Sequence, residues 1–160
     1  MYHVGNPEVI QYKHARTRAA IASARLERIE AYKEKTMSIS KVNLAWVAGL
    51  FEGEGSFDVK ISKRKTYHNE YLRMQLSSTD EDVIEKLYSY VGVGTVHGPY
   101  ANCRNDGLER KPYWHWTVSG SKALILAQKL LPFLGKRRTE KLEELLETHP
   151  TWKQLKFSNR

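Results

Sequence analysis

The chain has 160 residues and carries 26 Lys and Arg against 18 Asp and Glu, which gives a formal net charge of +8. At this length one domain with a core of its own is the simplest organisation. The single cysteine, Cys103, excludes an internal disulfide framework and a cysteine-based zinc site. No apolar run suits a membrane span and no signal peptide is recognisable. We therefore expect an intracellular protein without a membrane partner, either cytoplasmic in a bacterium or phage host or organellar, and not secreted. Its positive charge favours nucleic acid as the partner.

Residues 8–36 predict a long helix because they are rich in Ala, Arg, Glu and Lys. They contain few large apolar residues, so the helix has only a thin apolar stripe. We interpret residues 1–38 as a basic helical arm, residues 39–148 as the compact domain and residues 149–160 as a tail. Capping residues in SISKVN predict a second helix from Lys41 to about Phe51.

The rest of the domain alternates between hairpins and helices. After Gly55 apolar residues recur with period two in two segments, which predicts a β-hairpin across the polar turn KRKTYHN. The segment STDEDVIEKLYSYVG predicts a helix capped by Ser or Thr and stopped at Gly92. A second hairpin is predicted from GTVHGPY and YWHWTVS, and two more helices from SGSKALILAQKLLPFLG and KRRTEKLEELLETH. Because the strands come as hairpins, we expect the α+β class with an antiparallel sheet.

The second helix ends in VAGLFEGEG, which places two carboxylates where a helix exposes unpaired carbonyl groups and the negative end of its dipole. Acidic residues are unfavourable there without a positive neighbour, and we predict that this neighbour is a metal ion and not a side chain. Gly53 and Gly55 permit left-handed turns, which would aim the Glu54 carboxylate and the Gly53 carbonyl outward. Such oxygen donors suit Mg²⁺.

Small residues form a nearly bare stripe on the same helix. Such a stripe lets two helices approach closely, and two copies of the chain would then bring two acidic helix ends and two metal ions together. Paired metal ions suit an in-line phosphodiester displacement. An ordinary core helix with Ala and Gly by chance is the alternative interpretation. The predicted dimer interface comprises Ala45, Ala48, Gly49 and Glu52.

The segment VAGLFEGEGSF resembles the LAGLIDADG motif of homing endonucleases, with a position-by-position match from Val47 to Gly55. The likeness covers about residues 40–147 and includes VGVGTV and LLPFLGKRR. It implies an αββαββα fold with a saddle-shaped antiparallel sheet. For a member with one motif it also implies a homodimer, in which the motif helices pack along the two-fold axis.

The resemblance assigns roles to particular residues. Glu54 would be the catalytic carboxylate and ligate the divalent metal, helped by the carbonyl of Gly53. For Glu52 the resemblance favours a structural role at the helix end over that of a primary metal ligand. A basic residue near the start of the last helix would support the scissile phosphate. That residue corresponds to Lys136 or Arg137, and the register leaves both open.

The predicted sheet offers a surface for double-stranded DNA, because alternate residues of a strand point to opposite faces. We expect the buried face to contain Phe57, Val59, Ile61, Leu72, Met74, Leu76, Trp114, Trp116 and Val118. Polar groups on the other face could bond to base edges in a major groove, and basic loop residues could neutralise phosphates. For any single one of these residues a solvated strand face is the alternative. The predicted DNA-binding residues are Lys60, Ser62, Lys63, Arg64, Lys65, Arg73, Gln75, Ser77, His97, Arg104, Arg110, Lys111, Tyr113, His115 and Thr117.

Together these observations predict a homodimeric, Mg²⁺-dependent, sequence-specific double-strand DNA endonuclease that cuts a long, near-palindromic site. One alternative is a LAGLIDADG-derived RNA-splicing maturase or DNA-binding regulator without catalysis, which the presence of Glu54 disfavours. The other is a generic basic RNA-binding protein, which would require the motif to be a chance match.

Overall fold

The computed structural model describes residues 7–64, 67–102, 108 and 110–147, with their side chains except those of 7–16, 63–64 and 67–69. The chain forms two compact units, Met1–Glu34 and Lys35–Arg160. Helix α1 (Pro7–Met37) makes up the described part of the first unit and continues into the second. The predicted N-terminal helix is therefore confirmed. Within this helix Lys33 and Glu30, which lie one turn apart, form an ion pair with 2.7 Å between Nζ and Oε1.

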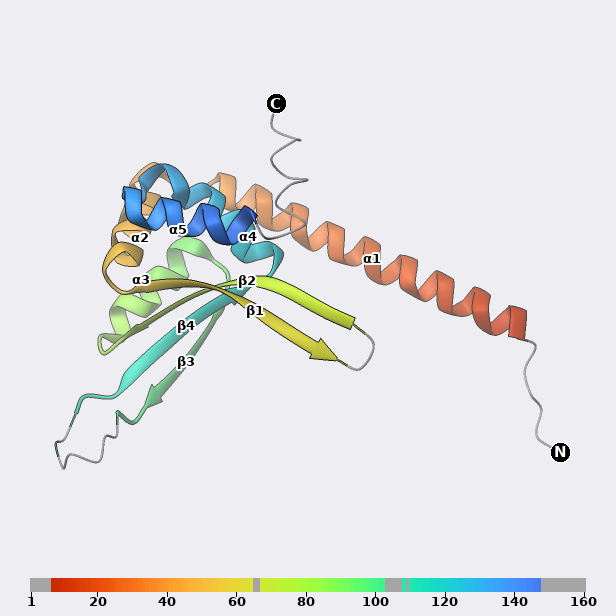
Figure 1. The fold of residues 1–160 in the computed structure, drawn as a ribbon, viewed down its shortest axis with the longest axis horizontal. Helices are drawn as coiled ribbons and strands as arrows, with labels where there is room; N and C mark the ends of the chain where they lie inside the picture. Colours follow the sequence, from red (N-terminus) through yellow and green to blue (C-terminus); the bar gives the residue numbers. More distant parts are fainter. Residues whose placement is uncertain (1–6, 65–66, 103–107, 109, 148–160) are drawn as a thin grey trace. The chain divides into compact units, whose positions relative to one another are not determined.

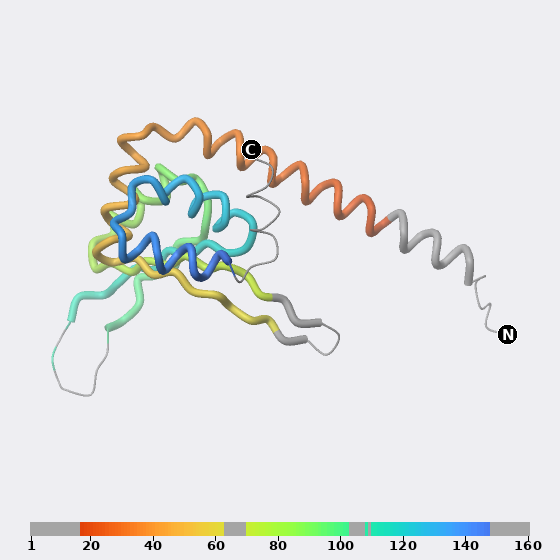
Figure 2. The backbone as a smooth tube through the Cα atoms, turned by 45° about the horizontal axis from the view of Figure 1, so that its top comes forward, coloured from red at the N-terminus to blue at the C-terminus, as the bar shows by residue number. Residues whose placement is uncertain are grey.

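The second unit combines helices with one four-stranded antiparallel sheet, as predicted, so the α+β class is confirmed (Figure 1). The strand order is β1-β2-β4-β3, which places β2 and β4 in the centre. In Figure 2 the two hairpins, β1–β2 and β3–β4, diverge from this centre. The elements in chain order are α2 (Lys41–Gly53), β1 (Gly55–Arg64), β2 (Tyr67–Ser78), α3 (Glu81–Val91), β3 (Thr95–Tyr100), β4 (Tyr113–Ser119), α4 (Ser121–Leu130), a 3₁₀ turn (Leu131–Phe133) and α5 (Lys136–Glu147).

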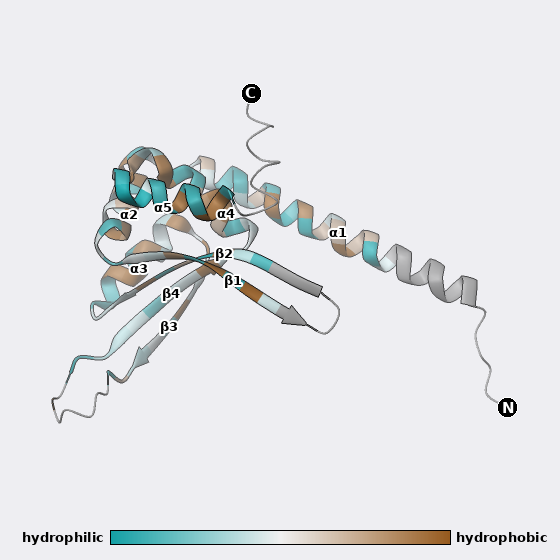
Figure 3. Ribbon diagram, in the orientation of Figure 1, coloured by the Kyte–Doolittle hydropathy of each residue, from teal (hydrophilic) through white to brown (hydrophobic). Residues whose placement is uncertain are grey.

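Helices α2 to α5 lie on one face of this sheet, and no described helix of the unit lies on the other (Figure 1). The core between the layers contains apolar side chains from every helix of this set and from the central strands. Figure 3 shows the hydrophobic stretches of these helices in brown. Phe51 stacks on Phe57 and meets Trp116 edge to face, with ring centroids 5.3 and 5.9 Å apart. The Trp116 indole donates a hydrogen bond to the Val93 carbonyl over 2.9 Å, so its one polar group is satisfied inside the core.

The period-two pattern correctly identifies most of the buried face of the sheet. Phe57, Leu72, Met74, Leu76, Trp116 and Val118 are buried, and Val59 and Trp114 are half-buried. Ile61 is an error of the prediction, because its side chain is 54% exposed. The outer part of the β1–β2 hairpin extends past helices α2 to α5 (Figure 1), and Ile61 lies toward that end of β1.

The helix ends agree with the expected signals in most cases. The Ser40 hydroxyl accepts a hydrogen bond from the Asn43 amide and caps α2, and Gly92 ends α3 in the left-handed conformation with φ of 61°. The N-cap of α3 is Asp80 and not the expected Ser or Thr, although the Ser78 hydroxyl accepts from the Asp80 amide at 3.1 Å. Strand β2 also begins earlier than predicted, at Tyr67.

Candidate nucleic-acid interface and acidic site

Helix α2 runs straight into strand β1 without the left-handed turn that the glycines suggested. Gly53 is the last helical residue, Glu54 has φ of −116° and ψ of −17°, and Gly55 opens the strand. Among the described glycines the positive φ values occur at residues 92, 94, 98 and 120, so the prediction for Gly53 and Gly55 is wrong. Gly55 has a different reason to be glycine, because a β-carbon there would overlap the Phe51 ring. The glycine thus allows the strand to leave the helix in close contact with the core.

The acidic end of α2 is held by residues near the start of α5. One carboxylate oxygen of Glu52 accepts a hydrogen bond from the Gly135 amide at 2.7 Å. The Glu52 carbonyl accepts another from the Arg138 guanidinium at 3.0 Å. A guanidinium at the carbonyl end of a helix offsets the negative end of the dipole. The prediction that only a metal ion, and no side chain, supplies positive charge there is therefore wrong.

Arg138 was not singled out from the sequence, although it belongs to the basic run KRR. The side chain is partly buried, and its Nε has no hydrogen-bond partner among the described residues. A buried, charged donor without a partner lowers the stability of the folded state. The hydrogen bond from the Arg138 guanidinium to the Glu52 carbonyl offsets part of this cost and holds the side chain in place. Which of three consecutive basic residues faces α2 depends on the phase of α5, and the sequence alone does not reveal it.

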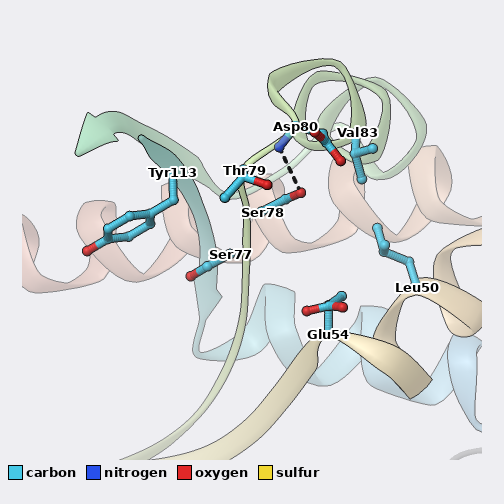
Figure 4. A pocket seen from close by; sticks show the side chains of 8 residues that line it. All are labelled: Leu50, Glu54, Ser77, Ser78, Thr79, Asp80, Val83 and Tyr113. Carbon is cyan, nitrogen blue, oxygen red and sulfur yellow. Dashed lines mark hydrogen bonds between the residues drawn. The ribbon is translucent and has the colours of Figure 1, made fainter. Parts of the chain in front are cut away.

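Glu54 differs from Glu52 because its carboxylate makes no hydrogen bond or ion pair with any residue that the structure describes. It is exposed and lines a hollow of about 420 Å³ between the end of α2, the end of β2 and the start of α3 (Figure 4). Hydroxyl and carboxylate groups dominate the polar part of the wall. The lining residues are Leu50, Glu54, Ser77, Ser78, Thr79, Asp80, Val83 and Tyr113.

The fit of this site to a divalent ion can be judged from its donors. A free carboxylate beside the carbonyl end of a helix provides the hard oxygen donors that Mg²⁺ prefers. No cluster of three or more His, Cys, Asp or Glu side chains occurs in the described part of the chain. One chain therefore offers a partial set of ligands, which suits Mg²⁺ because this ion keeps several waters and takes oxygens from a phosphate substrate.

The two candidate basic residues lie in the first turn of α5. The Lys136 side chain is 89% exposed, and its Nζ lies 3.9 Å from Glu140 Oε1 within the same helix. Arg137 is also exposed. Both side chains are thus available to an anionic ligand, and the alternative between them stays open.

The small-residue stripe of α2 lies on the surface in part. Ala45 and Gly49 are exposed, and within 4 Å a β-carbon added at Gly49 would meet no atom of the described residues beyond its chain neighbours and the nearby backbone of α2. Val42, one turn before Ala45, is 77% exposed. Ala48 has to be removed from the predicted interface, because its side chain is fully buried in the core of its own chain. Glu52 is half-buried and engaged with Gly135.

The sheet face opposite the helices carries the predicted polar residues. Lys60, Ser77 and His97 are exposed, while Ser62, Arg73, Gln75, Tyr113, His115 and Thr117 are half-buried. In the adjoining loop Lys111 is exposed and Arg110 is half-buried. The predicted side chains of Lys63, Arg64, Lys65 and Arg104 lie outside the described residues.

Several of these outward residues contact one another across the strands. Arg73 forms a double hydrogen bond with Asp58, and the Ser77 hydroxyl lies 2.8 Å from His115 Nδ1. Partial burial lowers the pKa of His115, and the nearby charges of Arg73 and His97 lower it further. The imidazole is therefore neutral at pH 7 and can both donate and accept a hydrogen bond.

The described helices include none with the length and apolar character of a membrane span.

A protein-family model described as LAGLIDADG endonuclease matches residues 47–145. The DNA endonuclease I-CvuI of Chlorella vulgaris is 28% identical over 105 residues, which are 62% of this chain and 60% of that protein. The chain thus spans less than two thirds of this relative.

Solved structures that match part of this chain include two endonucleases. The LAGLIDADG homing endonuclease I-GzeII in complex with its DNA target has a TM-score of 0.48 and 16% identity, over 63% of this chain and 34% of that one. The archaeal intron-encoded homing endonuclease I-Vdi141I complexed with DNA has a TM-score of 0.48 and 18% identity, over 64% of this chain and 65% of that one.

Proposed function

Because the chain belongs to the LAGLIDADG endonuclease family, we propose that it is a homing endonuclease that hydrolyses both strands of duplex DNA at a specific, long, near-palindromic site. The observation that carries this proposal is the free Glu54 carboxylate at the end of α2, which faces a polar hollow beside the open face of the sheet. A catalytic metal ligand has to be available for the ion, and Glu54 is available while its neighbour Glu52 is not.

The proposed metal site uses oxygen atoms from the end of α2. Glu54 would provide the carboxylate and Gly53 its carbonyl. Bound Mg²⁺ would stabilise the negative charge that develops on the phosphate oxygens. Lys136 or Arg137, both exposed at the start of α5, would bind the scissile phosphate. The Glu52 contacts with Gly135 and Arg138 hold the end of α2 and the start of α5 at a fixed separation, so they orient the two groups.

A homodimer would complete the site. A cut in both strands requires two catalytic carboxylates, and one chain offers a single Glu54 at this helix end. The exposed stripe of Val42, Ala45 and Gly49 allows α2 of a second copy to approach closely, because Gly49 leaves open space in place of a side chain. Packing along this stripe would bring the two Glu54 residues together across the two-fold axis.

Duplex DNA would bind on the sheet face that the helices leave open. This face presents hydroxyl, amide, imidazole and basic groups on strands, which fit the dimensions of a major groove. The net charge of +8 favours the approach of a polyanion. The exposed loop residue Lys111 would neutralise phosphate beside the groove-facing strands.

The substitution Glu54→Gln tests this function. It keeps the shape of the side chain but removes the charge that a metal ligand requires. With Mg²⁺ and a randomised duplex library, the unmodified protein should cut a defined subset of sequences. Glu54→Gln should retain the same DNA without cutting it. The matched control is Glu143→Gln on the exposed side of α5, which should cut as the unmodified protein does.

The other outcomes decide between the alternatives. A Glu54→Gln variant with full cutting activity would exclude the proposed role of this carboxylate. If the unmodified protein binds specific duplexes but does not cut them, a DNA-binding regulator is favoured. If it binds RNA in preference to DNA, a maturase is favoured. The number of cut strands, read on denaturing and native gels, separates double-strand cleavage from nicking.

A further inference from the structure

Arg73 and Asp58 form a cross-strand pair on the open face of the sheet. They are direct partners in the β1–β2 register. The Arg73 Nε donates to Asp58 Oδ1 at 2.9 Å and its Nη2 donates to Oδ2 at 2.5 Å. The two bonds run side by side, so the carboxylate fixes the plane of the guanidinium. The hydrogen bond to Asp58 is also the main reason why the pKa of Arg73 is raised.

The position of this pair places it where DNA would lie. Arg73 alternates with Leu72 and Met74, whose side chains are buried under the helices, so the guanidinium lies on the opposite face. Strand β2 is central and pairs with β1 on one side and β4 on the other. Side chains of 25% and 36% exposure remain within reach of a ligand on this face.

Asp58 is unexpected on a surface that would face DNA, which is a polyanion. It is the one acid among the outward positions of β1 and β2 whose side chains are described, namely residues 56, 58, 60, 62, 71, 73, 75 and 77. Its charge cancels that of Arg73, so the pair adds nothing to the general attraction for DNA. A half-exposed ion pair also contributes little to folding. The remaining benefit of the pair is geometric.

The geometry leaves a specific set of donors free. Asp58 occupies the side of the guanidinium formed by Nε and Nη2, and the end formed by Nη1 and the second Nη2 hydrogen is left for another ligand. Two parallel N–H groups match the O6 and N7 acceptors of guanine in the major groove. A side chain that is already held in one orientation loses less freedom when it binds.

We propose that Arg73 determines sequence specificity by reading one guanine in each half-site, and that Asp58 is the positioning residue that orients it. This inference rests on the proposed function, because it assigns one base contact within the DNA-binding face. In a homodimer the two copies of Arg73 would read two symmetry-related guanines. The bidentate contact of one Arg73 with one guanine should discriminate against other bases by roughly five- to 150-fold.

The test compares the sequence preferences of variants in the same randomised duplex library. The unmodified protein should select a motif with guanine at one position of each half-site. Arg73→Ala should lose the preference at that position and keep the preferences elsewhere. Arg73→Lys keeps the positive charge but not the fork, so it should lose the same preference. Asp58→Ala should weaken the preference at this one position.

A matched control is Lys60→Ala, which removes another cation from the same face of β1. It should weaken binding to all sequences alike and leave the guanine preference unchanged. If the unmodified protein selects a motif that Arg73→Lys leaves unaltered at every position, the role of Arg73 is wrong while the proposed function stands. If the unmodified protein selects no motif at all, both are wrong. Circular dichroism of each variant verifies the fold.

Discussion

The carboxylate of Glu52 accepts a hydrogen bond from the backbone amide of Gly135 at 2.7 Å, across 83 positions of the chain. The same helix end receives the Arg138 guanidinium on the Glu52 carbonyl. The two acids of the motif thus have separate tasks. Glu52 attaches α2 to the segment that leads into α5, and Glu54, two residues later, is left available to a ligand.

Substitution of Glu52 should therefore affect stability as well as cleavage. Glu52→Ala removes the acceptor for the Gly135 amide, and we expect the free energy of unfolding to fall by about 1 kcal/mol. Glu52→Gln keeps an oxygen at the same position and should lose less. Urea denaturation measures both changes, with Glu143→Ala on the exposed side of α5 as the control. Equal losses for Ala and Gln would show that the hydrogen bond does not account for the effect.

Gly53 and Gly55, two of the three glycines of the motif, should respond oppositely to Ala. A β-carbon at Gly55 would overlap Phe51, including its backbone, so Gly55→Ala should lower the free energy of unfolding by about 1–3 kcal/mol. Beyond its chain neighbours and the nearby helix backbone, a β-carbon at Gly53 would meet none of the described residues within 4 Å, and Gly53 is helical. Gly53→Ala should be neutral or stabilising by up to about 1 kcal/mol.

Thermal and urea unfolding of the two single variants measure this contrast. Each glycine variant serves as the control for the other, because both add the same methyl group within three residues. A Gly55→Ala variant as stable as Gly53→Ala would show that the strand can move away from Phe51 without cost.

The secondary structure followed closely from the sequence, because alternation in strands and capping signals in helices are local. The exposure of Ile61 did not follow, because it depends on where the helices above the hairpin end. Arg138 was missed for a similar reason, since its partner Glu52 is 86 positions away and only the phase of α5 selects it among three basic residues. The pairing of Arg73 with Asp58 required the register of β1 and β2, which alternation alone does not define.

The open space at Gly49 allows a test of the proposed dimer that spares the protomer. Leu is a better helix former than Gly, and its β-carbon would meet no atom of the described residues within 4 Å beyond its chain neighbours and the nearby backbone of α2. Gly49→Leu should therefore stay folded, but it should block the close approach of a second α2. We expect a dimer of the unmodified protein and a monomer of the variant in sedimentation velocity, with a loss of double-strand cutting of at least about tenfold.

The control for this experiment is Glu143→Leu, which adds an apolar side chain to an exposed position of α5, outside the stripe of α2. It should leave the oligomeric state and the cutting rate unchanged. A Gly49→Leu protein that remains dimeric and active would show that the two chains associate through another surface, or that the site needs only one chain.

His115 should make stability depend on pH. Its folded-state pKa lies below the ordinary value of about 6.5, because burial and the neighbouring Arg73 and His97 disfavour the imidazolium form. Well above pH 6.5 the imidazole is neutral in both states, so its contribution to stability is fully present. As the pH falls below 6.5, the unfolded chain takes up a proton first, and the folded state loses stability.

His115→Gln should therefore show a smaller decline in urea midpoint between pH 7.5 and 5.5 than the unmodified protein. Thr117→Val, on the same face but without a titratable group, should keep the full decline. An equal decline in His115→Gln would show that other groups cause it.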